Sequence, residues 1–211
     1  MNRILAFAFV SLLIACKPTS QNKYELLNKD AAFRAEISTR TGGSFVELSE
    51  GYTYYQEANK NSQKSTVILV HGFSVPSYIW ETTYEALIEK EFHVVVLDLY
   101  GRGFSDNPDT DYTDRLMANQ VLELINHLHI TQAHLVGLSN GGRIISQAAV
   151  LQPQLVQSLI YVSSNSFEDI EVTKDVSVST DEIAEFISRY PAIALGQLDD
   201  FFDPTQFPNW P

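Results

Sequence analysis

Short continuous apolar runs alternate along the chain with segments in which apolar residues recur at helical spacing. The runs are rich in β-branched side chains, which is typical of strands buried on both faces. They lie at Thr66–Val70, His93–Leu99, Ala133–Gly137 and Val156–Ser163. Helices are predicted between them, over Pro76–Glu91, Asp111–Leu128 and Gly141–Leu151. This alternation predicts an α/β fold with a mostly parallel, doubly wound sheet and helices on both faces.

Two further strands are predicted ahead of this region. Ser44–Leu48 and Tyr52–Glu57 flank a short turn, Ser49-Glu-Gly51, and together indicate a β-hairpin. With the four buried runs, the hairpin brings the predicted sheet to six strands.

The N-terminus carries a different pattern. A short positive start precedes an apolar run of twelve residues, Ile4–Ala15. A transmembrane helix needs about 20 residues, so residues 1–15 are more typical of a secretory signal peptide. Leu13-Ile-Ala-Cys16 resembles the lipobox of bacterial lipoproteins, and Cys16 is the only cysteine of the chain. This pattern predicts export to the bacterial cell envelope and anchoring in a lipid membrane through lipidated Cys16; the alternative is an ordinary uncleaved hydrophobic N-terminus.

The remaining chain divides by composition into three parts. Residues 16–43 form a tether and N-terminal segment, of which Lys17–Asn28 is polar. Residues 44–166 hold the alternating strands and helices. Residues 167–211 break that rhythm: a capping box at Ser179–Glu182 predicts a short helix, and an aromatic and proline-rich stretch follows.

Composition and charge narrow the range of partners. An apolar content of 45% indicates a globular protein. The formal net charge of −12 argues against nucleic acid and against an anionic membrane face as binding partners, because both would repel the protein.

One serine stands where a nucleophile would be expected. Gly137-Leu-Ser-Asn-Gly141 matches the pattern G-x-S-x-G between a predicted strand and a predicted helix. Such a turn forces the chain close to itself two residues before and two residues after the serine, so Gly137 and Gly141 suit it. The turn would also place Ser139 at a helix N-terminus, where free N–H groups favour negative charge. The alternative is a serine that caps the helix between two loop glycines.

Two other motifs end neighbouring strands. His71-Gly-Phe73 follows the run at Thr66, and Asp98–Ser105 (DLYGRGFS) follows the next one. Together with GLSNGG, in this order and at these intervals, they resemble the α/β-hydrolase superfamily, in particular its capped branch of esterases and lipases with a serine nucleophile. The resemblance covers roughly Ser44–Ser166.

The resemblance implies roles for individual residues. Ser139 would be the nucleophile, and the backbone N–H groups of Phe73 and Asn140 would form the oxyanion hole. Glu168 or Asp169 would be possible acids of a catalytic triad.

The family also implies structural roles and a reaction class. His71 would be structural rather than a base, and Asp98 and Arg102 would order their loop. The implied reaction is hydrolysis of a small-molecule ester or other acyl substrate, with no cofactor and no metal.

The histidine expected from the superfamily is missing. All five histidines precede Ser139, whereas in the superfamily the acid and then the histidine follow the serine. The superfamily sheet has eight strands and six are predicted here, so the chain resembles an N-terminal portion that ends within a partial helical cap. The strand at Val156 would then be a hydrophobic edge.

Two functions follow from this pattern. The first is a serine hydrolase that forms an acyl-enzyme on Ser139, with little activity expected from this chain. The alternative is a catalytically inactive envelope lipoprotein that keeps the hydrolase fold as a binding module or remnant.

Overall fold

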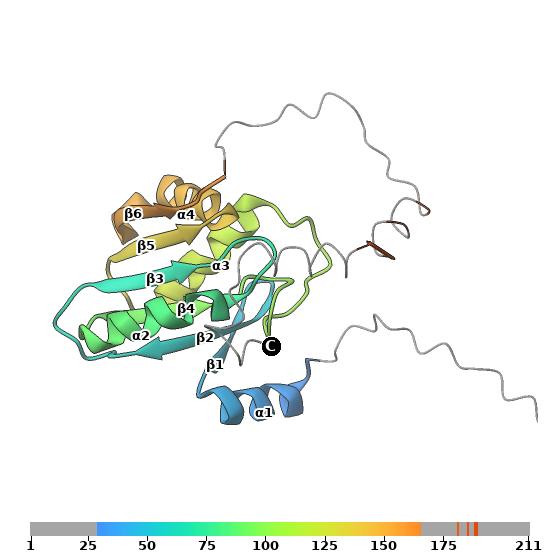
Figure 1. Cartoon of the computed structure of the whole chain (residues 1–211), viewed down its shortest axis with the longest axis horizontal. Coiled ribbons are helices and arrows are strands. Elements are labelled where there is room, and N and C mark those ends of the chain that lie inside the picture. The colour runs from blue at the N-terminus through green and yellow to red at the C-terminus, as the bar shows by residue number, and fades with distance from the viewer. Residues whose placement is uncertain (1–28, 166–180, 182–184, 186–187, 190–211) are drawn as a thin grey trace, which may run out of the picture. The chain divides into compact units, whose positions relative to one another are not determined.

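Six strands form one sheet in the order β1-β2-β4-β3-β5-β6 (Figure 1). The computed structural model describes residues 29–165 together with Asp181, Glu185, Ser188 and Arg189. The strands are β1 (Ser44–Leu48), β2 (Gly51–Ala58), β3 (Thr66–Val70), β4 (His93–Leu97), β5 (Ala133–Leu138) and β6 (Val156–Val162). β4, β3, β5 and β6 are parallel, and the hairpin β1–β2 joins β4 in antiparallel fashion. The predicted mostly parallel sheet is therefore confirmed.

The helices follow the strands in turn. They are α1 (Ala31–Thr41), the 3₁₀ helix η1 (Ser77–Trp80), α2 (Glu81–Glu89), α3 (Asp114–His127), α4 (Asn140–Leu151) and the 3₁₀ helix η2 (Pro153–Leu155). The chain divides into two units, residues 1–167 and 168–211. In the second unit the four described residues are helical.

The alternating side chains of the central strand show how the two faces of the sheet are covered. Ile68 and Val70 of β3 belong to a core that includes buried residues of α3 and α4. Val67 and Leu69 point to the other face, where they join Trp80 and residues of α2. Since side chains alternate along a strand, an all-apolar strand needs a layer on each face, and the helices provide both (Figure 1).

Two predicted helices begin later than the apolar spacing indicated. The segment Pro76–Glu91 is not a single helix, because the 3₁₀ turn η1 precedes α2. α3 begins at Asp114 rather than Asp111, since the Thr113 side chain accepts a hydrogen bond from the Leu116 N–H at 3.1 Å and caps the helix.

The helix α1 lies within the segment 16–43, for which no helix was predicted. Asp30 caps its N-terminus by accepting from the Phe33 N–H at 3.0 Å, and Gly42 ends it in the left-handed conformation. Only Ile37 of this helix is buried. A helix with so narrow an apolar face carries almost no periodic signal.

β6 is the outermost strand of the described sheet, as expected for the strand at Val156. Ile160, Tyr161 and Val162 are 45%, 45% and 36% exposed. An apolar parallel strand with these exposures differs from β3 and β4, whose residues are almost all buried.

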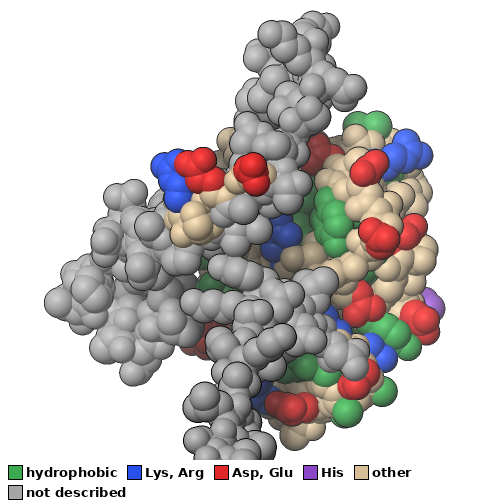
Figure 2. All heavy atoms as spheres, turned by 90° about the vertical axis from the view of Figure 1, so that its right-hand side faces the viewer, with side chains coloured by type: hydrophobic (Ala, Val, Ile, Leu, Met, Phe, Trp, Pro, Cys, Tyr) green, Lys and Arg blue, Asp and Glu red, His purple; other side chains and the backbone are tan. Residues whose placement is uncertain are grey.

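The acidic residues are dispersed on one face of the described part of the chain (Figure 2). On the face that Figure 2 shows, Asp and Glu side chains are scattered among neutral ones. Within the described residues no helix is long and apolar enough to cross a bilayer.

A buried glutamine joins α3 to the carboxyl edge of the sheet. The Gln120 Oε1 accepts from the Tyr100 N–H at 2.9 Å, and its Nε2 donates to Thr53 Oγ1 at 2.8 Å and to the Asp98 carbonyl at 3.1 Å. Gln120 is 1% exposed. The loop after β4 therefore depends on an amide that both donates and accepts.

We predict that Gln120→Leu lowers the free energy of unfolding by about 2–3 kcal/mol, because it leaves buried backbone groups without partners. Urea unfolding measures this change. Asn119→Leu, at the neighbouring exposed position of the same helix, should change stability by less than about 0.5 kcal/mol. Equal effects of the two substitutions would contradict the assigned role of Gln120.

Candidate active site

Ser139 is the single residue between β5 and α4, and its backbone conformation is strained. Its φ and ψ are 51° and −120°, a region that non-glycine residues rarely adopt. Its N–H donates to the Val162 carbonyl at 2.9 Å, and its own carbonyl accepts from the Gly142 N–H at 3.0 Å. Both peptide groups are thus held, and the side chain is left partly exposed at the sharp turn.

The glycines around the serine are required by close backbone approach. A Cβ on Gly137 would lie 2.5 Å from the Gly141 carbonyl carbon, and a Cβ on Gly141 would lie 2.5 Å from the Val70 carbonyl oxygen. Either methyl group would displace backbone rather than a movable side chain. The spacing G-x-S-x-G is therefore a steric consequence of the turn.

The loop after β3 runs directly beside the serine. A Cβ built on Gly72 would lie 3.0 Å from the Ser139 Cβ and 3.5 Å from its Oγ. The parallel pairing of β3 with β5, which aligns Val70 with Gly137, places both strand ends at the same edge. The structure thus brings together two motifs that lie about 70 residues apart in the sequence.

His71 is a buried structural residue that holds this loop. Its Nε2 accepts from the Leu99 N–H at 2.9 Å, so the proton is on Nδ1, which donates to the Gly72 carbonyl at 2.7 Å. That carbonyl belongs to the same peptide group as the Phe73 N–H. A hydrogen bond to the carbonyl fixes the peptide plane and polarises the N–H at its other end.

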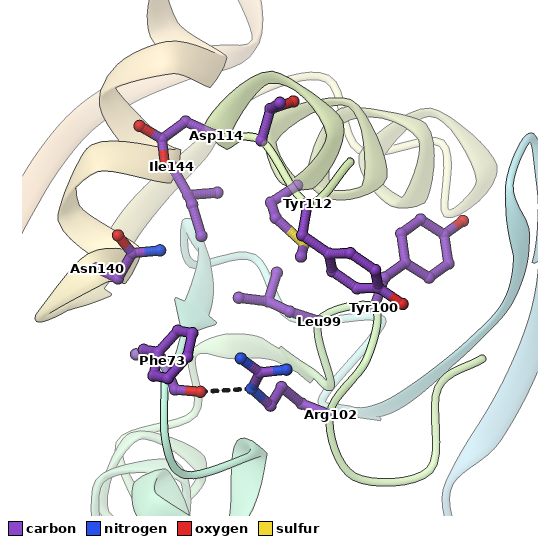
Figure 3. Close-up of a pocket in the computed structure, with 11 residues that line it drawn as sticks. Phe73, Leu99, Tyr100, Arg102, Tyr112, Asp114, Asn140 and Ile144 are labelled. Carbon is purple, nitrogen blue, oxygen red and sulfur yellow. Dashed lines mark hydrogen bonds between the residues drawn. The ribbon is translucent and has the colours of Figure 1, made fainter. Parts of the chain in front are cut away.

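Phe73 and Asn140, the residues predicted to form the oxyanion hole, line the same pocket. Both residues line a small pocket of about 60 Å³, and Figure 3 shows them on the same side of it. Among the described residues neither N–H donates a hydrogen bond, and Asn140 is the first residue of α4. Two free N–H groups that are aimed at the same point can bind an anionic oxygen.

Asp98 and Arg102 organise the loop that forms the opposite wall. The Asp98 carboxylate accepts from the N–H groups of Ser77 and Phe104, each at 2.8 Å. Arg102 donates through Nε to the Phe73 carbonyl, and its guanidinium lies 4.5 Å from the centre of the Phe73 ring (Figure 3). Arg102 also lines the pocket, so its position is not remote from a bound molecule.

The Ser139 hydroxyl has a partner that sequence reasoning missed. Its Oγ donates to the Asn165 Oδ1 at 3.1 Å. Asn165 follows β6 by three residues, and no motif in the sequence marks it. Only the pairing of β6 with β5 brings it to the turn.

None of the histidines, all of which the structure describes, makes a hydrogen bond to Ser139. His71 is engaged as above, and His93 bonds Glu57 and Thr66, each at 2.9 Å. His134 bonds Ser158 at 2.7 Å. Within the same residues no group of three or more His, Cys, Asp or Glu side chains is placed to hold a metal ion.

Several predicted site residues lie outside the described residues. These are Cys16, Glu168 and Asp169. Their assignment stays a prediction.

The comparisons with known proteins identify the family. The model of the α/β hydrolase fold matches residues 65–198, and the chain belongs to this family. This confirms the resemblance and the fold expected from HGF, DLYGRGFS and GLSNGG.

The most similar relatives share only part of their length with this chain. An uncharacterised protein of Mycobacterium tuberculosis is 38% identical over 112 residues, which cover 53% of this chain and 31% of that protein. The uncharacterised hydrolase YugF of Bacillus subtilis is 31% identical over 119 residues, covering 56% of this chain and 43% of the hydrolase. The chain thus spans less than half the length of these relatives.

Among solved structures, Est816 is similar in both fold and sequence. It is described as an N-acyl homoserine lactone degrading enzyme. The TM-score is 0.54 and the identity 30%, with 58% of this chain and 46% of Est816 covered.

We predict that His71 makes stability depend on pH. Burial lowers the pKa of His71 below its usual value, so between the folded and unfolded pKa values the unfolded chain binds more protons. Its contribution to stability is therefore complete above about pH 6.5 and is lost as the pH falls toward the lowered folded pKa, by up to about 1.4 kcal/mol per pH unit. Urea unfolding at a series of pH values measures the slope.

The matched variants are His71→Gln, which cannot titrate, and His127→Gln at the exposed end of α3. The first should flatten the slope below pH 6.5, and the second should retain it. A slope unchanged in His71→Gln would assign the pH dependence to other groups.

Proposed function

We propose that this chain is a serine-dependent acyl hydrolase that forms an acyl-enzyme on Ser139. The observation that carries the proposal is the position of Ser139: a partly exposed side chain at a turn with a positive φ, beside the loop that contains Gly72 and Phe73. Left-handed non-glycine residues are costly and are found where a fold holds a functional geometry.

The proposed reaction begins with attack of the Ser139 Oγ on the carbonyl carbon of an ester. The electrons of the carbonyl bond move to its oxygen, and the N–H groups of Phe73 and Asn140 stabilise the resulting anion. Collapse of this intermediate breaks the carbon–oxygen bond of the ester, and the leaving oxygen departs as the alcohol with the proton that the Ser139 hydroxyl lost. The acyl group stays on Ser139. Water then attacks the acyl carbonyl and releases the acid.

Among the described residues, the Ser139 hydroxyl contacts no side chain that could take its proton. A serine is a weak nucleophile unless a base removes its proton, and no histidine follows Ser139 in the sequence. The described contacts of Ser139 include one neutral amide and no carboxylate. We therefore propose that turnover by this chain alone is slow.

The pocket lining favours an ester with a small apolar group. Leu99, Met117 and Ile144 line it together with the Phe73 ring. The lactone named for Est816 is a cyclic ester, and this agrees with the proposed bond class.

A second function is supported by the neutral amide of Asn165, which occupies the position where a base would have to contact the Ser139 hydroxyl. We propose as the alternative a catalytically inactive envelope lipoprotein that keeps the fold as a binding module or remnant. In both cases the proposed location is the bacterial cell envelope, with the chain held at a lipid membrane through lipidated Cys16.

For the hydrolase, we expect slow release of p-nitrophenol from p-nitrophenyl acetate, and loss of this release in Ser139→Ala. Free imidazole should increase the difference between the two proteins, because it can take the proton that no side chain takes; the Ser139→Ala rate corrects for hydrolysis by imidazole itself. A residual rate is expected because oxyanion donors and binding alone can leave roughly 10³-fold over water.

Equal rates of the two proteins, with and without imidazole, would contradict a nucleophilic Ser139 and favour the inactive alternative. Rapid turnover without imidazole that is lost in Ser139→Ala would contradict the missing base.

For the anchor, we expect expression in a bacterial host to give a membrane-bound form that incorporates radiolabelled palmitate. Cys16→Ser should abolish both the label and the membrane binding, since it removes the thiol that is lipidated. An unlabelled wild-type chain would favour the ordinary hydrophobic N-terminus.

A further inference from the structure

We propose that Asn165 is a positioning residue that holds the Ser139 hydroxyl in its resting orientation, and that a carboxylate at this position would supply the base. This inference rests on the proposed function. Among the described residues Asn165 is the only acceptor of the Ser139 hydroxyl, with Oγ to Oδ1 at 3.1 Å.

Asn165 and Ser139 are joined by two bonds that run in opposite directions. The Asn165 N–H donates to the Ser139 carbonyl at 3.3 Å, while the Ser139 hydroxyl donates to the Asn165 side chain. A single loop bond could form at many relative orientations. Two bonds between the same residues fix both the backbone and the hydroxyl.

The approach of Asn165 is enforced by the segment before it. Ser163 has a positive φ of 44°, which turns the chain after β6. A Cβ on Gly142 would lie 2.8 Å from the Ser164 Cβ, so the segment passes against the start of α4 only because residue 142 is glycine. The contact with Ser139 is therefore part of the fold around the turn.

The chemistry of an amide defines what Asn165 does there. An amide oxygen accepts a hydrogen bond but does not take a proton in the working range of pH. Asn165 therefore orients the hydroxyl without activating it, and a base would have to replace this bond. A carboxylate has the same shape, would accept at the same place, and could take the proton.

In Asn165→Asp the new carboxyl group would carry the proton between the reacting atoms. The new carboxylate takes the hydroxyl proton as Oγ bonds the ester carbonyl carbon. The carboxylic acid returns this proton to the leaving oxygen when the carbon–oxygen bond of the ester breaks. A water molecule then gives a proton to the carboxylate as its oxygen attacks the acyl carbon. When the bond from this carbon to Oγ breaks, the carboxyl group returns the proton to Oγ, which releases the acid product and restores the Ser139 hydroxyl and the carboxylate.

The test compares five proteins that cover both residues: wild type, Ser139→Ala, Asn165→Asp, Asn165→Leu, and Asn165→Asp with Ser139→Ala. The substrate is p-nitrophenyl acetate, and rates are measured from pH 4 to pH 8, a range chosen around the usual carboxylate pKa of about 4. Asn61→Asp is the matched control for charge. It lies in the loop before β3, at the opposite end of the strand from the site.

Asn165→Asp should raise the Ser139-dependent rate by about 10²-fold, the lower end of what a positioned general base contributes. Its rate should rise with pH through the ionisation of the new carboxyl group and then level off. The rate of Asn165→Leu should show no such rise with pH, and the rate of Asn61→Asp should equal that of the wild type. Thermal unfolding of each protein shows whether the fold is retained.

The two proposals fail in different ways. If Ser139→Ala leaves the rate unchanged in every background, the proposed nucleophile is wrong. A different result would be a wild-type rate that depends on Ser139 and a folded Asn165→Asp protein that shows neither a faster rate nor a rise of the rate with pH. In that case the role proposed for Asn165 is wrong and the proposed function stands. An increase that persists with Ser139→Ala would also contradict it.

Discussion

The close approach of three strand ends at one edge of the sheet is the constraint on which the site depends. β5 turns into α4 through one left-handed residue, and this turn contacts the end of β3 at distances that exclude any side chain on Gly141. β6 closes the other side through the bond from the Ser139 N–H to the Val162 carbonyl. Backbone packing, more than any side chain, therefore determines where the hydroxyl lies.

Buried polar groups keep that edge in place. His71 links the loop after β3 to the end of β4, and Asp98 and Gln120 satisfy the N–H groups of the loop that follows. Each group is almost fully buried, so each unmade bond would cost more than an exposed one. The apolar layers on both faces stabilise the sheet, whereas these bonds determine the shape of its carboxyl edge.

Much of the fold could be predicted from the sequence because its strands are continuous apolar runs. β3 was predicted with the bounds that the structure has. α1 could not be predicted, since one buried residue makes no periodic pattern. Helix starts were missed where a capping side chain, such as Thr113, rather than the apolar spacing sets the first turn.

The site, like the fold, could be predicted only in part. Ser139, Phe73 and Asn140 are found by motifs because close backbone contact restricts the residue types at and around the turn. No motif restricts the residue type at position 165. The contact of Asn165 with Ser139 arises from the register of β6 against β5. Residues that act through tertiary pairing alone leave little trace in a single sequence.

The two halves of the proposed acyl-transfer site have different physical origins in this fold. In the proposed site the donors for an anion would come from the backbone, so the turn between β5 and α4 and the loop after β3 would be enough to provide them. A base is a side chain, and it must be delivered to within hydrogen-bond distance of Ser139 Oγ by another segment. In this chain the segment that arrives there, after β6, delivers the amide of Asn165. The geometry for holding a tetrahedral anion and the capacity to move a proton are therefore separable, and the first can be present in a fold without the second.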